Sequence, residues 1–266
     1  MSVKREPDGR RTVQVEVEVP GTPEQVWAAI ATGPGISAWF VPATVEEKLG
    51  GKLACTFGPG MDSVAKITGW DPPRRLTAES EGWMPGAPPM ATEWTVTAKA
   101  GGICIVRVVH SLFASTDDWD NQLEATEGGW PTFFAVLRLY LGHHAGQPSA
   151  IVQVMQPAAG TIDETWEQLA RPLGLADKGV GQTVRSGAGA PPLAGTVERV
   201  SAADGRSCLV RLTEPAPGAA VVGAYNCGAV MAMVSLYLWG PRAGAAAGRE
   251  RGAWEAWLGG RFAVKA

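Results

Sequence analysis

The sequence predicts an α+β fold, in which an antiparallel sheet packs against helices gathered on one face. Two observations lead to this class. Short segments of alternating apolar and polar residues fill residues 52–111, and one long segment of helical periodicity, residues 115–142, follows them. Strands that follow one another without intervening helices pair antiparallel, and such a sheet buries one face under helices. A weaker repeat of the same order after residue 150 indicates a second copy of the fold.

The strands are predicted from residue alternation. Residues 12–19 place four valines on one face and polar side chains on the other, which is typical of a half-buried strand. Thr22-Pro23-Glu24 then predicts a helix start, and Gly33-Pro34-Gly35 is expected to end that helix. On the last strand of the run, residues 103–111, His110 shares a face with three apolar residues. The intermediate strands are expected at residues 52–57, 64–70, 76–81 and 92–99.

The long helix carries the aromatic side chains of the predicted core. Ser115 or Thr116 would cap it, with two aspartates in its first turn, and Gly142 would end it. Pro131 cannot donate a backbone hydrogen bond, so we expect the helix to bend there. A twisted sheet curls, and a long helix across its hollow would leave an elongated cavity.

The composition of the chain argues against several kinds of binding partner. The chain has 266 residues and a formal net charge of −3, which argues against nucleic acid binding. It shows neither an apolar run of membrane-spanning length nor an apolar secretory segment, so we expect a cytoplasmic protein without a membrane partner. The four cysteines form no C-x-x-C pair, and His143-His144 is interpreted as a solvated helix end. We therefore expect no metal, no disulfide framework and no cofactor.

Several short motifs in register carry a family resemblance. They are GTPEQVWAAI at residues 21–30, AWF at 38–40, GG at 50–51, WDPPRRL at 70–76 and GW at 129–130. In this order they resemble the START/Bet v 1-like (SRPBCC) superfamily, and more narrowly its activator-of-Hsp90-ATPase-like or polyketide cyclase branch. The resemblance implies a helix-grip fold over residues 10–145, a curved antiparallel sheet gripping a long C-terminal helix, which mostly binds hydrophobic small molecules. Binders, carriers and enzymes share this frame.

The second copy is expected over residues 150–266 as a shortened, degenerate helix-grip-like domain. Gly160-Thr161 followed by Trp166 repeats the spacing of Gly21-Thr22 followed by Trp27. Residues 240–248 are interpreted as a loop, and the final helix is expected to be short and to end at Gly259-Gly260. Strands are expected at residues 151–155, 196–200, 208–213, 219–226 and 230–239.

The candidate site is the aromatic interior of the first copy. His110 could act as a general base or orient a phenol, but we favour a buried structural histidine, because no carboxylate shares its face. Trp83 and Met84, in a proline-rich loop, are candidates for a lid. The candidate ligand-binding residues are Trp39, Phe57, Trp94, His110, Trp130, Phe133, Phe134, Leu137 and Tyr140.

Three functions fit these residues. The first is non-enzymatic binding of a hydrophobic, aromatic or polyketide-type molecule, because a large aromatic face lacks a convincing catalytic set. By resemblance to tandem START-like proteins of natural-product pathways, including enediyne pathways, such a binder would be a carrier, a self-resistance protein or a biosynthetic accessory protein, with a possible protein partner from the pathway. The second is a polyketide cyclase or aromatase that uses His110. The third is a chaperone-regulating interaction module.

Overall fold

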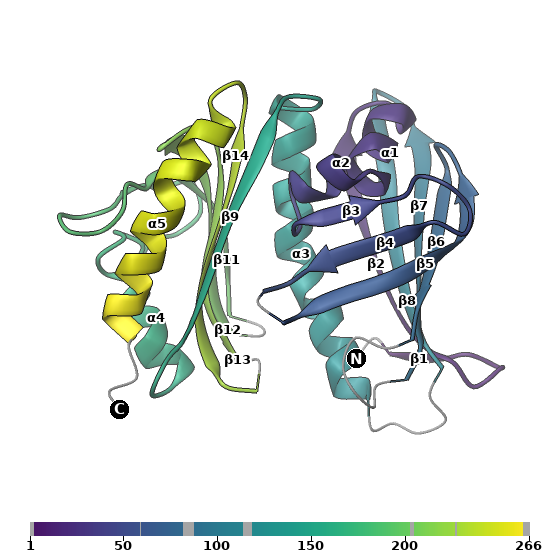
Figure 1. The fold of residues 1–266 in the computed structure, drawn as a ribbon, viewed down its shortest axis with the longest axis horizontal. Coiled ribbons are helices and arrows are strands. Elements are labelled where there is room, and N and C mark those ends of the chain that lie inside the picture. The colour runs from purple at the N-terminus through teal and green to yellow at the C-terminus, as the bar shows by residue number, and fades with distance from the viewer. Residues whose placement is uncertain are drawn as a thin grey trace. The chain divides into compact units, whose positions relative to one another are not determined.

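The chain forms two compact units, Met1–Gly146 and Gln147–Ala266 (Figure 1). A computed structural model describes residues 3–58, 60–81, 88–113, 119–202, 205–226 and 228–262. Each unit contains one antiparallel sheet followed by a long C-terminal helix, which confirms the predicted α+β class. Within the described ranges, no helix has both the length and the apolar character needed to cross a membrane.

Unit 1 is built on an eight-stranded antiparallel sheet in the order β1-β2-β8-β7-β6-β5-β4-β3. The alternating segments predicted from the sequence form its strands, while the short β1 and β3 at its edges were not predicted. On β8 the inward residues Cys104, Val106 and Val108 are fully buried, as the alternation predicted. The strands are β1 (Lys4–Arg5), β2 (Arg11–Pro20), β3 (Ala43–Val45), β4 (Lys52–Thr56), β5 (Asp62–Asp71), β6 (Arg75–Ser80), β7 (Met90–Lys99) and β8 (Ile103–Leu112).

Two short helices precede the sheet's central strands. Helix α1 (Pro23–Ala31) is capped by Thr22. The Thr22 hydroxyl accepts the backbone N–H of Gln25, and the Gln25 side chain accepts the backbone N–H of Thr22. Helix α1 ends at Ala31, before Gly33-Pro34-Gly35 as predicted, and a second short helix that was not predicted, α2 (Gly33–Ser37), begins there. The Thr32 hydroxyl accepts the Gly35 N–H at 3.0 Å, and a proline in a first helical turn loses no helical hydrogen bond.

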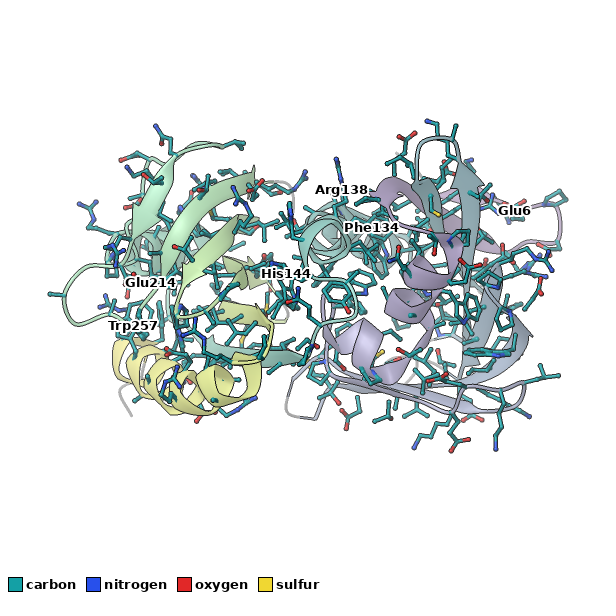
Figure 2. The ribbon with its side chains drawn as sticks, turned by 90° about the horizontal axis from the view of Figure 1, so that it is seen from above. Glu6, Phe134, Arg138, His144, Glu214 and Trp257 are labelled. Carbon is teal, nitrogen blue, oxygen red and sulfur yellow. The ribbon has the colours of Figure 1, made fainter. Side chains whose placement is uncertain are left out.

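Helix α3 (Asp120–His143) closes unit 1, with Pro131 inside it. The predicted cap at Ser115 or Thr116 lies outside the described residues. Figure 2 shows Phe134 pointing into the interior of the unit, whereas Arg138 points away from it and is exposed. An ion pair of 2.7 Å between Arg11 and Asp120 joins the start of β2 to the first turn of the helix. The helix therefore presents its aromatic face to the sheet, as its periodicity predicted.

Unit 2 repeats the architecture with six strands in the order β10-β11-β12-β13-β14-β9. Helix α4 (Ile162–Ala170) begins at Thr161 with the same reciprocal cap, here completed by Glu164. Gly21 and Gly160, which precede the two caps, have positive φ angles of 127° and 98°. A residue with a side chain would be strained in this backbone conformation. The strands are β9 (Ser149–Pro157), β10 (Thr183–Arg185), β11 (Ala194–Ser201), β12 (Gly205–Glu214), β13 (Gly218–Asn226) and β14 (Val230–Trp239).

The last helix of unit 2 differs from its prediction. Helix α5 runs from Ala243 to Phe262, so the interpretation of residues 240–248 as a loop was wrong, and the helix continues through Gly259-Gly260. Alanine has the highest helix propensity, which outweighs the scattered glycines. Ala243, Ala246 and Ala247 recur at helical spacing and are buried against the sheet. Small side chains therefore let this helix lie close to its sheet.

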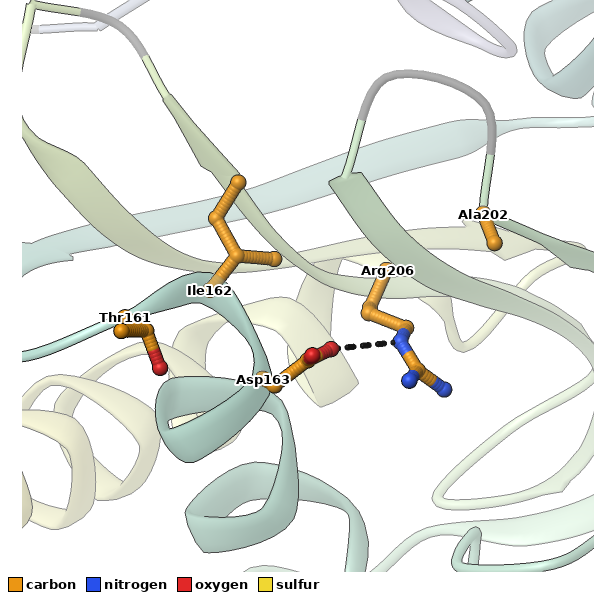
Figure 3. Close-up of a pocket in the computed structure, with 5 residues that line it drawn as sticks. All are labelled: Thr161, Ile162, Asp163, Ala202 and Arg206. Carbon is orange, nitrogen blue, oxygen red and sulfur yellow. Dashed lines mark hydrogen bonds and ion pairs between the residues drawn. The ribbon is translucent and has the colours of Figure 1, made fainter.

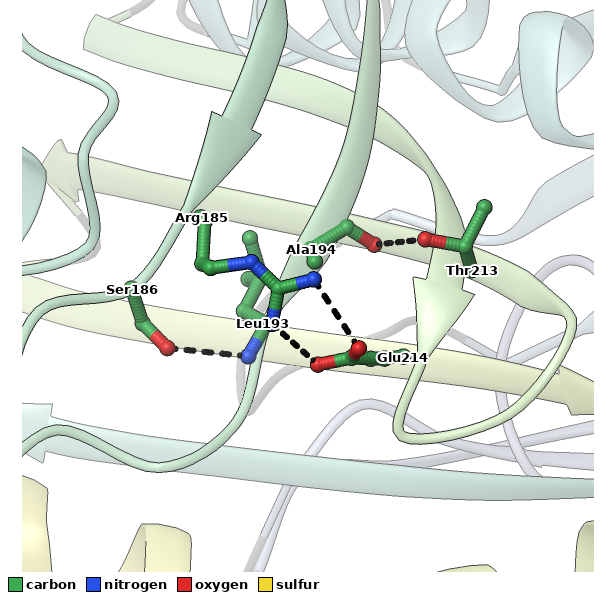
Figure 4. A network of polar contacts seen from close by, with 6 residues as sticks. All are labelled: Arg185, Ser186, Leu193, Ala194, Thr213 and Glu214. Carbon is green, nitrogen blue, oxygen red and sulfur yellow. Dashed lines mark hydrogen bonds and ion pairs between the residues drawn. The ribbon is translucent and has the colours of Figure 1, made fainter.

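The edge of the second sheet is held by polar contacts between β10, β11 and the end of β12 (Figure 4). Arg185 forms a two-pronged ion pair with Glu214, at 2.7 and 3.0 Å. The Ser186 hydroxyl accepts the Leu193 N–H, and the Thr213 hydroxyl donates to the Ala194 carbonyl. These contacts are exposed or half-buried, and we assign them to the fold rather than to a site.

Candidate functional site

Aromatic rings fill the space between the sheet and α3 in unit 1. Trp130 on α3 is at the centre, and its ring centroid lies 5.0 Å from Phe40, 5.1 Å from Trp94, 5.3 Å from Phe134 and 6.4 Å from Trp39. Trp39, Trp94, Trp130 and Phe134 are each at most 9% exposed. Ring pairs at these separations attract through stacked and edge-to-face contacts. The expected elongated cavity is therefore occupied by the protein's own side chains in this conformation.

We define the aromatic cluster as these rings together with two others at its outer edge. Phe133 is half-buried and meets Phe40 edge-to-face at 4.7 Å, and Phe57 meets Phe40 at 5.6 Å. Phe57 remains 37% exposed. The cluster thus extends continuously from the buried core to the surface. Its members are Trp39, Phe40, Phe57, Trp94, Trp130, Phe133 and Phe134.

His110 is joined to this cluster by a hydrogen bond. Its Nε2 accepts the indole N–H of Trp130 at 3.0 Å, and its Nδ1 lies 3.0 Å from the Thr92 hydroxyl. Because the indole nitrogen can only donate, Nε2 carries no proton, and the neutral ring carries its proton on Nδ1. The Nδ1–H therefore donates to Thr92. Strand pairing explains the contact, since Thr92 on β7 is the direct cross-strand partner of His110 on β8.

Burial determines the charge of this histidine. His110 is 6% exposed, and desolvation lowers its pKa from 6.5 to about 4. Both ring nitrogens are engaged inside the protein, and both partners are neutral. A general base needs a free nitrogen near its substrate, so this conformation favours the structural role over the catalytic one.

The remaining candidate residues fall into two groups. Leu137 is fully buried, and the Tyr140 hydroxyl accepts the Gly146 N–H at 3.2 Å near the C-terminal end of α3. At the helical rise, Tyr140 is about 15 Å along the helix from Trp130. Tyr140 therefore lies beyond the cluster, towards the C-terminal end of α3. Trp83 and Met84, the candidate lid, lie outside the described residues.

Two site residues were missed from the sequence. Phe40 contacts four rings of the cluster, although its motif neighbour Trp39 was predicted to line the site. Thr92 accepts the Nδ1–H of His110. The signal for Thr92 was present, because it shares the inward register of its strand with Trp94. A signal for Phe40 was present too, because it belongs to the AWF motif at residues 38–40.

Unit 2 contains no comparable ring cluster among its described residues, and its core is largely aliphatic. A depression at the start of α4 is lined by Thr161, Ile162, Asp163, Ala202 and Arg206 (Figure 3). Asp163 and Arg206 form an exposed ion pair across it at 2.8 Å. Exposed pairs of this kind are weak. The depression therefore gives no sign of a built ligand site.

The described residues show no group of histidine, cysteine and acidic side chains arranged to hold a metal ion. Cys55, Cys104 and Cys208 are free and buried. Burial raises the pKa of Cys55 to about 11 and that of Cys208 to about 12, so these two thiols are protonated and unreactive at neutral pH.

The family model of the Activator of Hsp90 ATPase homolog 1-like protein matches residues 20–142. The match covers less than half of the chain and lies within unit 1. It covers β3 to β8 and α3 up to Gly142, and with them every ring of the aromatic cluster. No curated protein matches the chain.

Three solved structures are similar to the chain. CalU16 from Micromonospora echinospora is 20% identical over 53% of this chain and 83% of its own, with a TM-score of 0.43. DynU16, from the dynemicin biosynthetic locus, is 20% identical over 93% and 95%, with a TM-score of 0.44. BexL, a di-domain ARO/CYC from the BE-7585A biosynthetic pathway, is 12% identical over 96% and 100%, with a TM-score of 0.46. At these values the likenesses carry no argument about function.

Proposed function

We propose that unit 1 binds a hydrophobic, aromatic small molecule of the polyketide type between its sheet and α3. The chain would then serve as a carrier, a self-resistance protein or an accessory protein in natural-product metabolism. The observation that carries the proposal is the aromatic cluster, which runs from buried Trp39 to exposed Phe57. The natural-product setting comes from the resemblance of the sequence motifs to the polyketide cyclase branch.

The contact energy available is sufficient for binding without catalysis. A flat polycyclic molecule that buries about 300 Å² of apolar surface gains roughly 7 kcal/mol before the cost of association. Stacking on several rings of the aromatic cluster adds to this value. Micromolar affinity is therefore within reach of the ring contacts alone.

The test is a titration of the full chain with emodin, a hydroxylated anthraquinone, followed by amide chemical shifts. We expect the shifts to concentrate on residues of the aromatic cluster. Phe57→Ala should weaken binding several-fold, because Phe57 is the exposed end of the cluster. Phe113→Ala is the matched control, since Phe113 is 46% exposed in the same unit but outside the cluster. Absence of shifts up to the solubility limit of emodin, or shifts confined to unit 2, would refute the proposal.

The two alternatives make different predictions. A cyclase that uses His110 would turn over a poly-β-ketone and lose rate in His110→Gln without loss of folding. We rank this function second, because both ring nitrogens of His110 already have hydrogen-bond partners. A chaperone-regulating module would retain a chaperone in a pull-down, and recovery of none would count against it.

A further inference from the structure

The Trp130 side chain combines the two features expected of a ligand in this site, a flat aromatic body and one polar group. Its ring is 4% exposed and is surrounded by the rings of the aromatic cluster. Its N–H makes a hydrogen bond to a side chain of the sheet, His110. The centroids of these two rings are 5.6 Å apart and their planes differ by 16°, so the two rings lie nearly parallel.

We propose that Trp130 occupies the binding site of unit 1 as an internal substitute for the ligand. The ligand is then an aromatic molecule with a hydroxyl or ring N–H group, which replaces the indole ring and donates to His110 Nε2. This inference rests on the proposed function and specifies the chemical class of the ligand.

The polar requirement follows from the contacts of His110. Its Nδ1–H is bonded to Thr92, so Nε2 is left as the acceptor that faces the cluster. When the indole leaves, a hydrocarbon guest would bury this acceptor without a partner, which is strongly unfavourable. A guest with a hydroxyl group restores the bond. Affinity should therefore increase when a methyl group of the guest is replaced by a hydroxyl group, although the hydroxyl group itself prefers water.

The sequence around Trp130 is suited to moving this side chain. Gly128 and Gly129 precede it and Pro131 follows it, and these are the residue types with the lowest helix propensities. Pro131 also removes one backbone hydrogen bond from this turn of α3. The turn that carries Trp130 is therefore the weakest part of the helix.

The outer rings of the aromatic cluster line a path for a ligand from the surface to Trp130. Phe40 is half-buried and stacks on Trp130, and Phe57 and Phe133 meet Phe40 from the surface side. An aromatic guest can thus contact rings at each step from the surface to Trp130.

The experiment compares 2-naphthol with 2-methylnaphthalene. The two molecules are similar in size, and the first carries a hydroxyl group where the second carries a methyl group. Binding of both to the full chain and to Trp130→Ala is measured by calorimetry and by the nitrogen-proton spectrum of the indole groups. We expect wild-type protein to bind 2-naphthol at least tenfold tighter than 2-methylnaphthalene, a factor typical of one hydrogen bond. Trp130→Ala should bind 2-naphthol about tenfold tighter than wild type, because the site is vacated.

Two further variants keep the test decisive. Trp130→Phe identifies the indole signal of Trp130 by its disappearance, and in wild-type protein this signal should shift when 2-naphthol binds. This measurement does not depend on whether Trp130→Ala folds. Adding His110→Phe to Trp130→Ala should abolish the preference for the hydroxyl compound while both compounds still bind.

The inference and the proposed function fail in different ways. Equal affinity for the two naphthalenes, or binding that leaves the Trp130 signal unchanged, would refute the inference and leave the binding function intact. No binding of either naphthalene or of emodin, to wild-type protein or to Trp130→Ala, would refute both.

Discussion

The buried histidine makes unit 1 sensitive to acid, and this prediction can be quantified. The His110 ring has a pKa of about 4 in the folded chain, against 6.5 for an exposed histidine. The unfolded chain therefore binds more protons between these values, and the free energy of unfolding falls as the pH decreases from 6.5 towards 4. Above pH 6.5 the ring is neutral in both states, and its full contribution is retained.

The size of the effect follows from the two pKa values. Relative to neutral pH, the loss is about 1 kcal/mol at pH 5.5 and about 2.5 kcal/mol at pH 4.5 for a folded pKa of about 4. The partners of the ring, Thr92 and Trp130, do not titrate in this range. The loss should thus be specific to His110. His110→Gln is the matched variant, because its amide can bond both partners without titrating.

The assay is urea unfolding of the full chain, followed at the indole N–H signal of Trp130 so that unit 1 is observed. The difference between wild type and His110→Gln should change by the stated amounts between pH 7.5 and pH 4.5. The chain has three histidines, so the ring signal lost in His110→Gln identifies His110 in a direct titration. A midpoint near 6.5, or a difference that does not vary with pH, would refute the argument from burial.

Three further predictions concern packing and can be checked by urea unfolding. Thr92→Val should destabilise unit 1 by about 1–3 kcal/mol, because it leaves the buried Nδ1–H of His110 without an acceptor; an unchanged midpoint would contradict the assigned tautomer. Gly35→Ala should destabilise unit 1 severely, because a Cβ there would overlap the Ala28 carbonyl, whereas Gly244→Ala on α5 meets open space and should stabilise unit 2 by about 1 kcal/mol. Ala247→Leu should cost about 1–3 kcal/mol by overpacking, while Ala245→Leu at an exposed position of the same helix should be nearly neutral.

The sequence predicted the elements that depend on a regular residue period. The alternation of residues 103–111 placed His110 on the inward face, and the helical spacing placed Trp130 and Leu137 on the aromatic face of α3. Both properties are set by backbone geometry, which a period reveals.

The contacts between elements could not be predicted in this way. The bond from Trp130 to His110 depends on the rotation of α3 over the sheet, and the role of Thr92 depends on strand register. The start of α2 and the extent of α5 were missed because glycine and proline were interpreted only as breakers. Instead, the cap at Thr32 starts α2, and the buried alanines between Ala243 and Ala247 hold the first turns of α5 against the sheet.

The reciprocal caps at Thr22 and Thr161 show how much of each unit's first helix is set by the local sequence alone. Each cap is assembled from four neighbouring residues and needs nothing from the rest of its unit. The two caps are alike although the interiors differ, with aromatic rings in unit 1 and mainly aliphatic side chains in unit 2. The start of the first helix is therefore independent of what fills the unit behind it.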